Sequence, residues 1–226
     1  MSHRQWANDA DNHEVFGIKG QGKSFFERER IRSFKGRVLI YDHKGEFFHF
    51  FKARPCKTFG QASAALKTNG GAIYWPGNVL SRLAPVDADG KRGEPPVRAK
   101  FRRFCEWAWH ECQRLPGRKL IVFDECGVVM NSNQTLYDQH PLSLIMNDGR
   151  SFGIDTLCTA HSPVHMPPNF RNMHTTVTTF RLGSATAAGY LTADFGFEAR
   201  QIMALQKGHY LQWHNGNVRA GKVTFK

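Results

Sequence analysis

The chain has 226 residues, a length at which one α/β core closes and two full domains would be cramped. Hydrophobic residues are 41% and charged residues 22%, a composition that excludes disorder, a collagen-like repeat or a coiled coil. No apolar run approaches the ~20 residues of a membrane span, and residues 1–6 do not form the apolar segment of a secretory signal. The 31 lysines and arginines against 19 acids give a net charge of +12, which predicts a polyanionic partner such as nucleic acid, with a basic protein that binds none as the alternative.

Short runs rich in Val, Ile and Phe alternate with longer helical patterns along the chain. This alternation is typical of an α/β fold in which crossover helices connect a mainly parallel sheet. The predicted strands are 13–17, 37–42, 72–75, 119–124, 154–160 and 175–182. A β-hairpin of 210–214 and 218–225 around Asn215-Gly216 is expected to close the fold.

The first predicted strand runs into a glycine-rich loop that opens a helix. Its sequence is Gly17-Ile18-Lys19-Gly20-Gln21-Gly22-Lys23-Ser24, which fits G-x-x-x-x-G-K-[ST]. In such a loop the backbone amides surround a β-phosphate, Lys23 reaches the β and γ oxygens, and the Ser24 hydroxyl ligates Mg²⁺. Residues 17–24 are therefore predicted to bind the phosphates of a nucleotide together with Mg²⁺.

The second predicted strand ends in an acidic, glycine-containing turn, Tyr41-Asp42-His43-Lys44-Gly45-Glu46-Phe47. A phenylalanine-rich run, 47–51, follows directly and invites a base-stacking role. Such a run beside a sheet is more typical of a core or a subunit interface, and a protein that grips duplex DNA contacts phosphates rather than unstacked bases. We expect the run to pack.

A polar loop over 84–96 separates the third strand from an amphipathic helix. Lys91 and Arg92 make this loop a candidate DNA contact, although a plain solvent loop explains it equally well. The apolar stripe of the helix consists of Phe101, Phe104, Cys105, Ala108, Cys112 and Leu115. The stripe is predicted to pack on the sheet, with its cysteines in the core rather than on a metal. The opposite face is expected to be solvated, with a DNA contact as the less favoured alternative, and comprises Arg102, Arg103, Glu106, His110 and Arg114.

The five cysteines of the chain are odd in number and contain no C-x-x-C pair. This pattern indicates reduced thiols in a cytosol rather than a disulfide framework or a zinc knuckle.

The fourth predicted strand ends in Asp124-Glu125, ahead of an Asn- and Ser-rich loop at 131–135. An apolar strand that ends in an acid supplies the second half of a phosphate-loop site, although alone it would equally be a strand and its turn. Asp124 is predicted to hold Mg²⁺ through water. Glu125 is placed to polarise an attacking water, which favours hydrolysis over phosphoryl transfer to a small acceptor.

Together with four later segments, these blocks resemble the FtsK–HerA superfamily of ATP-driven DNA pumps, in the order that the family has. The segment Gly149-Arg150-Ser151-Phe152-Gly153-Ile154 is similar to the family's G-R-x-x-G block, whose arginine reaches the neighbouring subunit's nucleotide. Thr159-Ala160-His161-Ser162-Pro163 stands where the family usually has T-x-Q at the end of its sensor strand. Segments 169–172 and 179–182 resemble its closing blocks.

Two departures from the family pattern concern His161 and the phosphate loop. His161 replaces the sensor glutamine: a neutral imidazole donates one hydrogen bond, as an amide does, but it also titrates, and a strand-end histidine with no catalytic part is the alternative. Lys19 and Gln21 stand where the family more often has small residues, but a backbone cradle does not depend on those side chains.

The resemblance implies a RecA-like P-loop NTPase of the ASCE class, with 1–226 as a single motor domain and Lys23, Glu125, Arg150 and His161 as catalytic residues. It implies an ATPase that uses ATP and Mg²⁺, forms a homo-oligomeric ring and moves double-stranded DNA without sequence preference. A structural arginine is the alternative for Arg150.

The compact chain resembles the genome-packaging ATPases of icosahedral viruses with an internal membrane. This branch implies the host cytoplasm or a virion vertex as its location, with vertex or membrane proteins as further partners. Three alternatives stay open: an ATP-binding vertex or assembly protein that hydrolyses little, a cellular or conjugative DNA pump of the same superfamily, and a P-loop kinase for a small metabolite. The kinase would need an arginine-rich lid, which is not evident.

Overall fold

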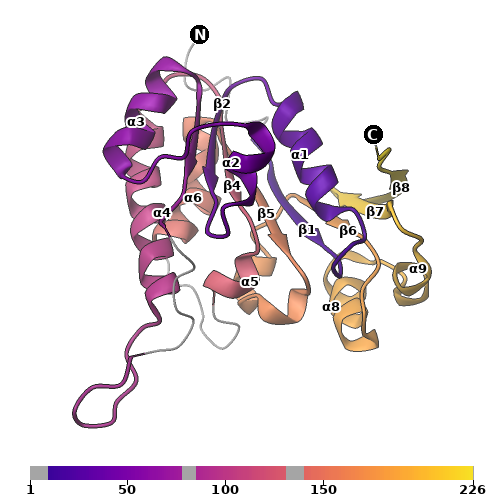
Figure 1. Cartoon of the computed structure of the whole chain (residues 1–226). Coiled ribbons are helices and arrows are strands. Elements are labelled where there is room, and N and C mark those ends of the chain that lie inside the picture. The colour runs from indigo at the N-terminus through magenta and orange to yellow at the C-terminus, as the bar shows by residue number, and fades with distance from the viewer. Residues whose placement is uncertain (1–9, 78–84, 131–139, 226) are drawn as a thin grey trace.

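The computed structural model describes residues 10–77, 85–130 and 140–225, and its centre is one sheet with helices on both faces (Figure 1). The first residues, Ala84 and the loop predicted at 131–135 lie outside the described residues. The strands are β1 (Asn12–Phe16), β2 (Arg37–Tyr41), β3 (Gly71–Tyr74), β4 (Lys119–Phe123), β5 (Ile154–Ala160), β6 (Thr176–Thr179), β7 (His209–His214) and β8 (Asn217–Lys222).

The strand order across the sheet is β3-β2-β4-β5-β1-β6-β7-β8. The strands from β3 to β6 are parallel, and β7 and β8 add to that edge as an antiparallel pair. The predicted α/β fold with a C-terminal hairpin is confirmed. Because β1 lies between β5 and β6, the loop after β1 opens at the middle of the carboxyl edge, where open α/β sheets bind ligands.

The helices are α1 (Lys23–Ser33), α2 (Glu46–Phe51), α3 (Phe59–Thr68), α4 (Pro96–Arg114), α5 (Cys126–Val129), α6 (Pro141–Asp148), α7 (Pro168–Arg171), α8 (Ala185–Phe195) and α9 (Ala199–Ala204). Two 3₁₀ turns, η2 (Gly149–Phe152) and η3 (Pro163–His165), flank β5. Alternate residues of the strands feed two cores: Ile121 and Phe123 pack with α4 and α6, whereas Leu120 and Val122 pack with α1 and α2.

Helix α4 carries the predicted apolar stripe on its buried face. Phe104, Cys105, Ala108 and Cys112 are all fully buried, so the two cysteines lie in the core as predicted. The face opposite the stripe is exposed along its length. The helix ends at Arg114, and Leu115 is buried just beyond it.

The phenylalanine-rich run packs, as predicted. The whole run lies in α2, where Phe47 is buried and Phe48, Phe50 and Phe51 are half-buried. The Arg28 guanidinium of α1 lies 3.8 Å from the centroid of the Phe50 ring.

Both predicted C-terminal strands end earlier than expected. After Thr179 the chain turns toward the loop that follows β1, where the Ile18 N–H donates to the Arg181 carbonyl over 3.0 Å. After Lys222 the chain leaves β8, and the Val223 N–H donates to the Gly208 carbonyl over 2.8 Å. The hairpin turn itself is as predicted, with positive φ at Asn215 (47°) and Gly216 (81°).

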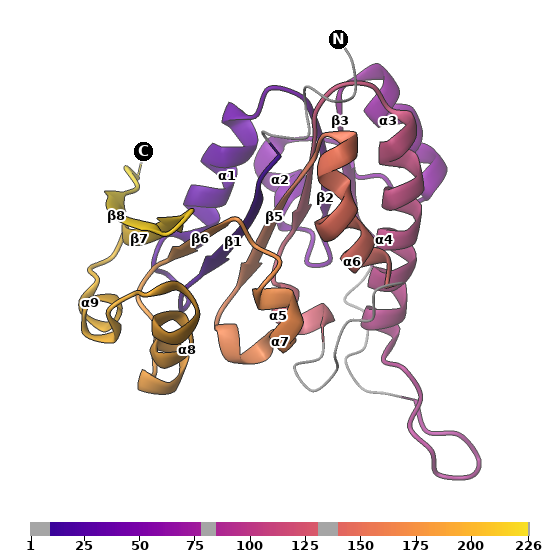
Figure 2. The same cartoon turned by 180° about the vertical axis from the view of Figure 1, so that it is seen from behind.

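The loop before α4 projects beyond the carboxyl edge of the sheet (Figure 2). An antiparallel bridge joins Val86 and Arg92 at its base, and the Asp87 carboxylate accepts from the N–H groups of Asp89 and Lys91. Its exposure agrees with a loop. Within the described ranges every helix is too short or too polar to cross a bilayer.

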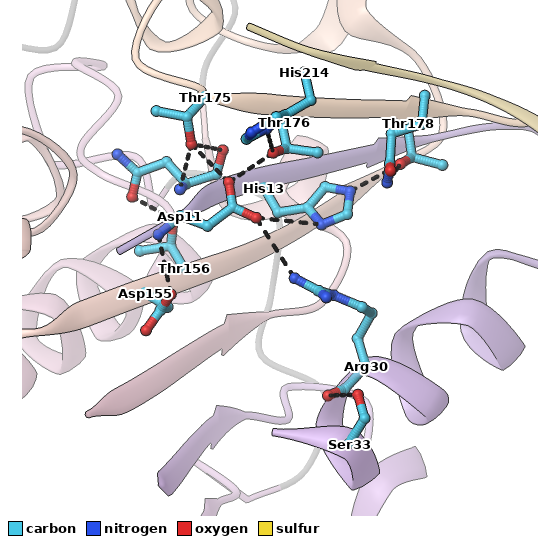
Figure 3. A network of polar contacts seen from close by, with 12 residues as sticks. Asp11, His13, Arg30, Ser33, Asp155, Thr156, Thr175, Thr176, Thr178 and His214 are labelled. Carbon is cyan, nitrogen blue, oxygen red and sulfur yellow. Dashed lines mark hydrogen bonds and ion pairs between the residues drawn. The ribbon is translucent and has the colours of Figure 1, made fainter. Parts of the chain in front are cut away.

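A polar network fastens the beginning of β1 at the opposite edge of the sheet (Figure 3). The Asp11 carboxylate accepts from the hydroxyls of Thr175 and Thr176 over 2.6 and 2.7 Å. Its backbone N–H donates to Asp155, which pairs with Arg118. The network therefore ties the chain before β1 to both strands that flank β1.

Candidate nucleotide-binding active site

The loop between β1 and α1 has the backbone of a phosphate cradle. Gly17 has φ 150° and a Cβ there would lie 2.7 Å from the Phe180 Cβ, while Gly22, with φ 119°, precedes the first turn of α1. No side chain caps α1, so its first amides are available to an anion. The Gln21 carbonyl accepts from the Gly208 N–H over 2.9 Å, which fixes the outer side of the loop.

Lys23 lies inside this loop with 8% of its surface exposed. Its ammonium donates to the carbonyl of Gly17 and lies 3.2 Å from His161 Nδ1. Burial lowers its pKa, against the nearby carboxylates of Glu125 and Asp124, which favour the charged form. A buried ammonium held by the carbonyls of the glycine-rich loop is a cation suited to bind phosphate oxygens.

Asp124 and Glu125 follow β4 directly and face the loop. The Thr159 hydroxyl of β5 joins them: it accepts from the Glu125 N–H over 3.0 Å and donates to Asp124 Oδ1 over 3.0 Å. Glu125 has φ 54°, a left-handed conformation that is unfavourable for a residue with a side chain. Thr159 thus holds both acids in place, one of them in a strained backbone.

His161 lies between Lys23 and Glu125. Its Nε2 is 3.1 Å from Glu125 Oε2, and its Nδ1 faces the Lys23 ammonium. Because the ammonium only donates, Nδ1 accepts and the ring proton on Nε2 points to the carboxylate. The imidazole therefore bridges Lys23 and Glu125, as an amide side chain would there.

Lys44 is a residue of this site to which the sequence assigned no role. Its ammonium lies 3.5 Å from Asp124 Oδ2 and 3.4 Å from Glu125 Oε2. Burial opposes its charge, but the two acids outweigh burial and raise its pKa. The Asp42 carboxylate positions Lys44 by accepting from four N–H groups, those of residues 45–48.

Glu27 is a second residue that the motif did not indicate. It lies one helical turn after Lys23 and is 1% exposed. Burial, reinforced by Asp124, raises its pKa well above the ordinary value. No sequence signal marks it, because a glutamate on a charged helix normally faces solvent.

The site offers the ligands that a magnesium ion requires. Ser24 is exposed at the start of α1, and it and Asp124 line the same cavity. Hydroxyl and carboxylate oxygens are hard donors of the kind that Mg²⁺ binds, and a cation is already attracted to the acids, as the position of Lys44 shows. Ser24 and Asp124 would hold the ion, which neutralises phosphate charge.

These residues share one cavity of about 470 Å³ on the carboxyl edge. Its walls include Lys19, Gly20, Gly22, Lys23, Ser24, Lys44, Asp124, Glu125, Thr159, His161 and Phe225. Of the predicted loop, Gly17 and Ile18 instead offer their carbonyls to Lys23, and Gln21 anchors the loop from outside.

Arg150 lies apart from this cavity, in η2 at the amino end of β5. The seven residues of β5 span about 20 Å, so Arg150 cannot reach the phosphates bound by its own chain. It is half-buried, and its Nε makes no hydrogen bond within the described residues. Any catalytic role for Arg150 therefore requires a second copy of the chain.

The strand order and the phosphate loop together define an α/β P-loop NTPase fold. No protein-family model and no curated protein sequence matches the chain. Among solved structures, the genome packaging NTPase B204 of Sulfolobus turreted icosahedral virus 2, in complex with AMPPCP, superposes with a TM-score of 0.73 at 13% identity, covering 96% of this chain and 99% of that chain.

Two further solved structures also share the fold. The bacterial conjugative coupling protein TrwB has a TM-score of 0.64 at 11% identity, covering 96% of this chain and 86% of its own. VirB4 of Thermoanaerobacter pseudethanolicus has a TM-score of 0.66 at 9% identity, covering 97% and 91%. The predicted resemblance to FtsK–HerA-type P-loop ATPases is thus confirmed at the level of the fold.

Proposed function

We propose that this chain is an ATP-driven translocase of double-stranded DNA, and within that class a viral genome-packaging ATPase. One observation carries the proposal: Lys23, the adjacent Asp124 and Glu125, and His161 come from three segments of the chain and converge on one cavity. A phosphate loop, an acid for the metal, a base for water and a polar sensor are what ATP hydrolysis requires.

In the proposed reaction, water attacks the γ-phosphorus of ATP and the bond to the β-γ bridging oxygen breaks, giving ADP and phosphate. Glu125 accepts the proton of the attacking water. His161 orients Glu125 through its Nε2–H, and Lys23 moves from the Gly17 carbonyl to the β and γ oxygens. Bound Mg²⁺, held by Ser24 and Asp124, supplies charge neutralisation.

The proposal that the chain acts on DNA rests on its net charge and on the functions named for proteins of the same fold. The net charge of +12 favours phosphate contacts, which are insensitive to base sequence. The neighbour B204 is named as a genome packaging NTPase and TrwB as a conjugative coupling protein. We place residues 1–226 in one motor domain of a homo-oligomeric ring, in the host cytoplasm or at a virion vertex, where vertex or membrane proteins are its further partners.

DNA-stimulated ATP hydrolysis tests the proposal. The wild type is expected to hydrolyse ATP faster with duplex DNA of any sequence, and the stimulation should fall steeply with salt. Glu125→Gln should bind ATP but not turn it over. ATP binding without hydrolysis under all conditions would instead support the vertex or assembly protein.

A conjugative or cellular DNA pump is the second candidate, favoured by the likeness to TrwB, which is named as a conjugative coupling protein. Protection of duplex DNA from nuclease, in the presence of empty virus shells and ATP, distinguishes the two. DNA-stimulated hydrolysis without protected DNA would favour the pump over the packaging ATPase.

A further inference from the structure

We infer that Phe225 is the platform on which the base of the bound nucleotide stacks, an inference that rests on the proposed ATPase function. Phe225 was expected only as the end of a hairpin strand. In the structure it has left β8 and lines the cavity of Lys23 and Ser24, with 49% of its surface exposed.

The Phe225 ring is held in place from several sides. It meets the Phe25 ring of α1 edge-on, at 5.5 Å between centroids, and the Lys207 ammonium lies 5.5 Å from its centroid. A Cβ on Gly208 would lie 2.8 Å from the ring and one on Gly22 would lie 3.4 Å from it. The ring therefore rests on two glycines, one of them in the phosphate loop, and a side chain at Gly208 would displace it.

The two ends of the cavity differ in chemistry. Lys23, Asp124, Glu125 and His161 form one end, where the β- and γ-phosphates and the attacking water belong. Phe225 lies beside Gly22 and against Phe25, the residue after Ser24. A nucleotide with its triphosphate in the loop extends past the start of α1, which brings its base to the Phe225 ring.

Stacking on a phenylalanine determines what this platform recognises. A ring face carries no donor or acceptor, so it binds any planar base and does not distinguish adenine from guanine. The platform thus adds affinity for a nucleoside triphosphate over an inorganic triphosphate. Stacking of one base contributes about 5- to 100-fold in affinity.

Binding of ATP, GTP and inorganic tripolyphosphate, each with Mg²⁺, to the full chain tests the inference. Phe225→Ala should lose about 5- to 100-fold in affinity for ATP and by the same factor for GTP, while tripolyphosphate binds as to the wild type. Phe225→Leu keeps an apolar contact with the glycines and should lose nucleotide affinity in the same way. Phe225→Trp should retain it, and its added fluorescence should be quenched by ATP but not by tripolyphosphate.

Val218→Ala is the matched control, because Val218 is a similarly exposed apolar residue of β8 that does not line the cavity. It should bind all three ligands as the wild type does. Unchanged ATP affinity in Phe225→Ala or Phe225→Leu would overturn the inference. Equal losses for ATP and tripolyphosphate would also overturn it, because the ring would then only support the loop. If the wild type bound neither ATP nor tripolyphosphate, the proposed function itself would fail.

Discussion

Replacing Thr159 by valine tests whether one hydroxyl sets the geometry of both acids. Valine keeps the shape of threonine but leaves the buried Glu125 N–H without its acceptor and Asp124 Oδ1 without its donor. A buried donor left unsatisfied costs about 1–3 kcal/mol, and the left-handed backbone at Glu125 stores strain of similar size. Without the hydroxyl, no hydrogen bond from Thr159 holds Glu125 in its left-handed conformation, and we expect the backbone to relax and move the Glu125 carboxylate.

We expect kcat to fall although the protein stays folded, so that the loss of stability does not account for the loss of rate. Misplacement of a catalytic group by about 1 Å costs on the order of 100-fold, so single-turnover ATP hydrolysis by Thr159→Val should slow by about that factor while ATP affinity changes little. The free energy of unfolding, measured by urea denaturation, should fall by about 1–3 kcal/mol.

Thr156→Val provides the matched control. Thr156 lies on the same strand, is equally buried and donates to Asn12 Oδ1 over 2.9 Å, away from the cavity. This variant should lose similar stability and keep its kcat. A kcat of Thr159→Val within threefold of wild type, or equal losses of kcat in both variants, would refute the role assigned to Thr159.

Four further substitutions test residues of the cavity and of the opposite, amino edge of the sheet. Lys23→Ala should abolish ATP binding and hydrolysis, measured by calorimetry and phosphate release, because it removes the ammonium enclosed by the loop; near-normal turnover would contradict the nucleotide assignment. His161→Gln should keep most activity and His161→Ala should lose it, because the amide also bridges the lysine and Glu125; equal rates for both variants would make His161 structural. Arg150→Ala should lose about 10³- to 10⁵-fold in turnover but keep ATP affinity, and mixing it with Lys23→Ala subunits should restore part of the rate; mixed oligomers without any restored turnover would make Arg150 a structural arginine. Burial lowers the pKa of His13 to about 3, so between pH 6.5 and about 3 the unfolded chain binds a proton that the folded chain does not. As the pH falls through this range, the unfolding free energy of the wild type should decrease by about 1.4 kcal/mol per pH unit relative to that of His13→Gln. Parallel curves of unfolding free energy against pH for the two proteins would show that His13 is not buried in its neutral form.

The sequence predicted the parts of this site whose residues are neighbours in the chain. The loop of 17–24 and the acids after β4 have motifs because a phosphate cradle and a strand-end carboxylate need fixed neighbours in the chain. His161 was found through its place in a resembling block, and the structure puts it beside Lys23 and Glu125.

The residues that the sequence missed act across strands. Lys44 reaches the acids because β2 pairs with β4, with Tyr41 opposite Phe123. Strand order is a property of the whole chain, and no local pattern encodes it. Phe225 was missed for a similar reason: contacts between distant parts of the chain bring it to the phosphate loop, among them the hydrogen bond from the Val223 N–H to the Gly208 carbonyl and the ring contact with Phe25.

The central position of β1 has a consequence for how the chain matures on the ribosome. β1 is made first, but its neighbours are β5, whose Thr156 lies 144 residues later, and β6 beyond that. At 5–20 residues per second, synthesis of β5 lags behind β1 by roughly 7 to 30 s. Until then β1 and the glycine-rich loop have no sheet to join, and such long-range pairing is slow even in the complete chain. A nascent chain whose synthesis has not yet passed β6 should therefore be unable to retain ATP, and β1 is the segment that a chaperone would meet during that interval.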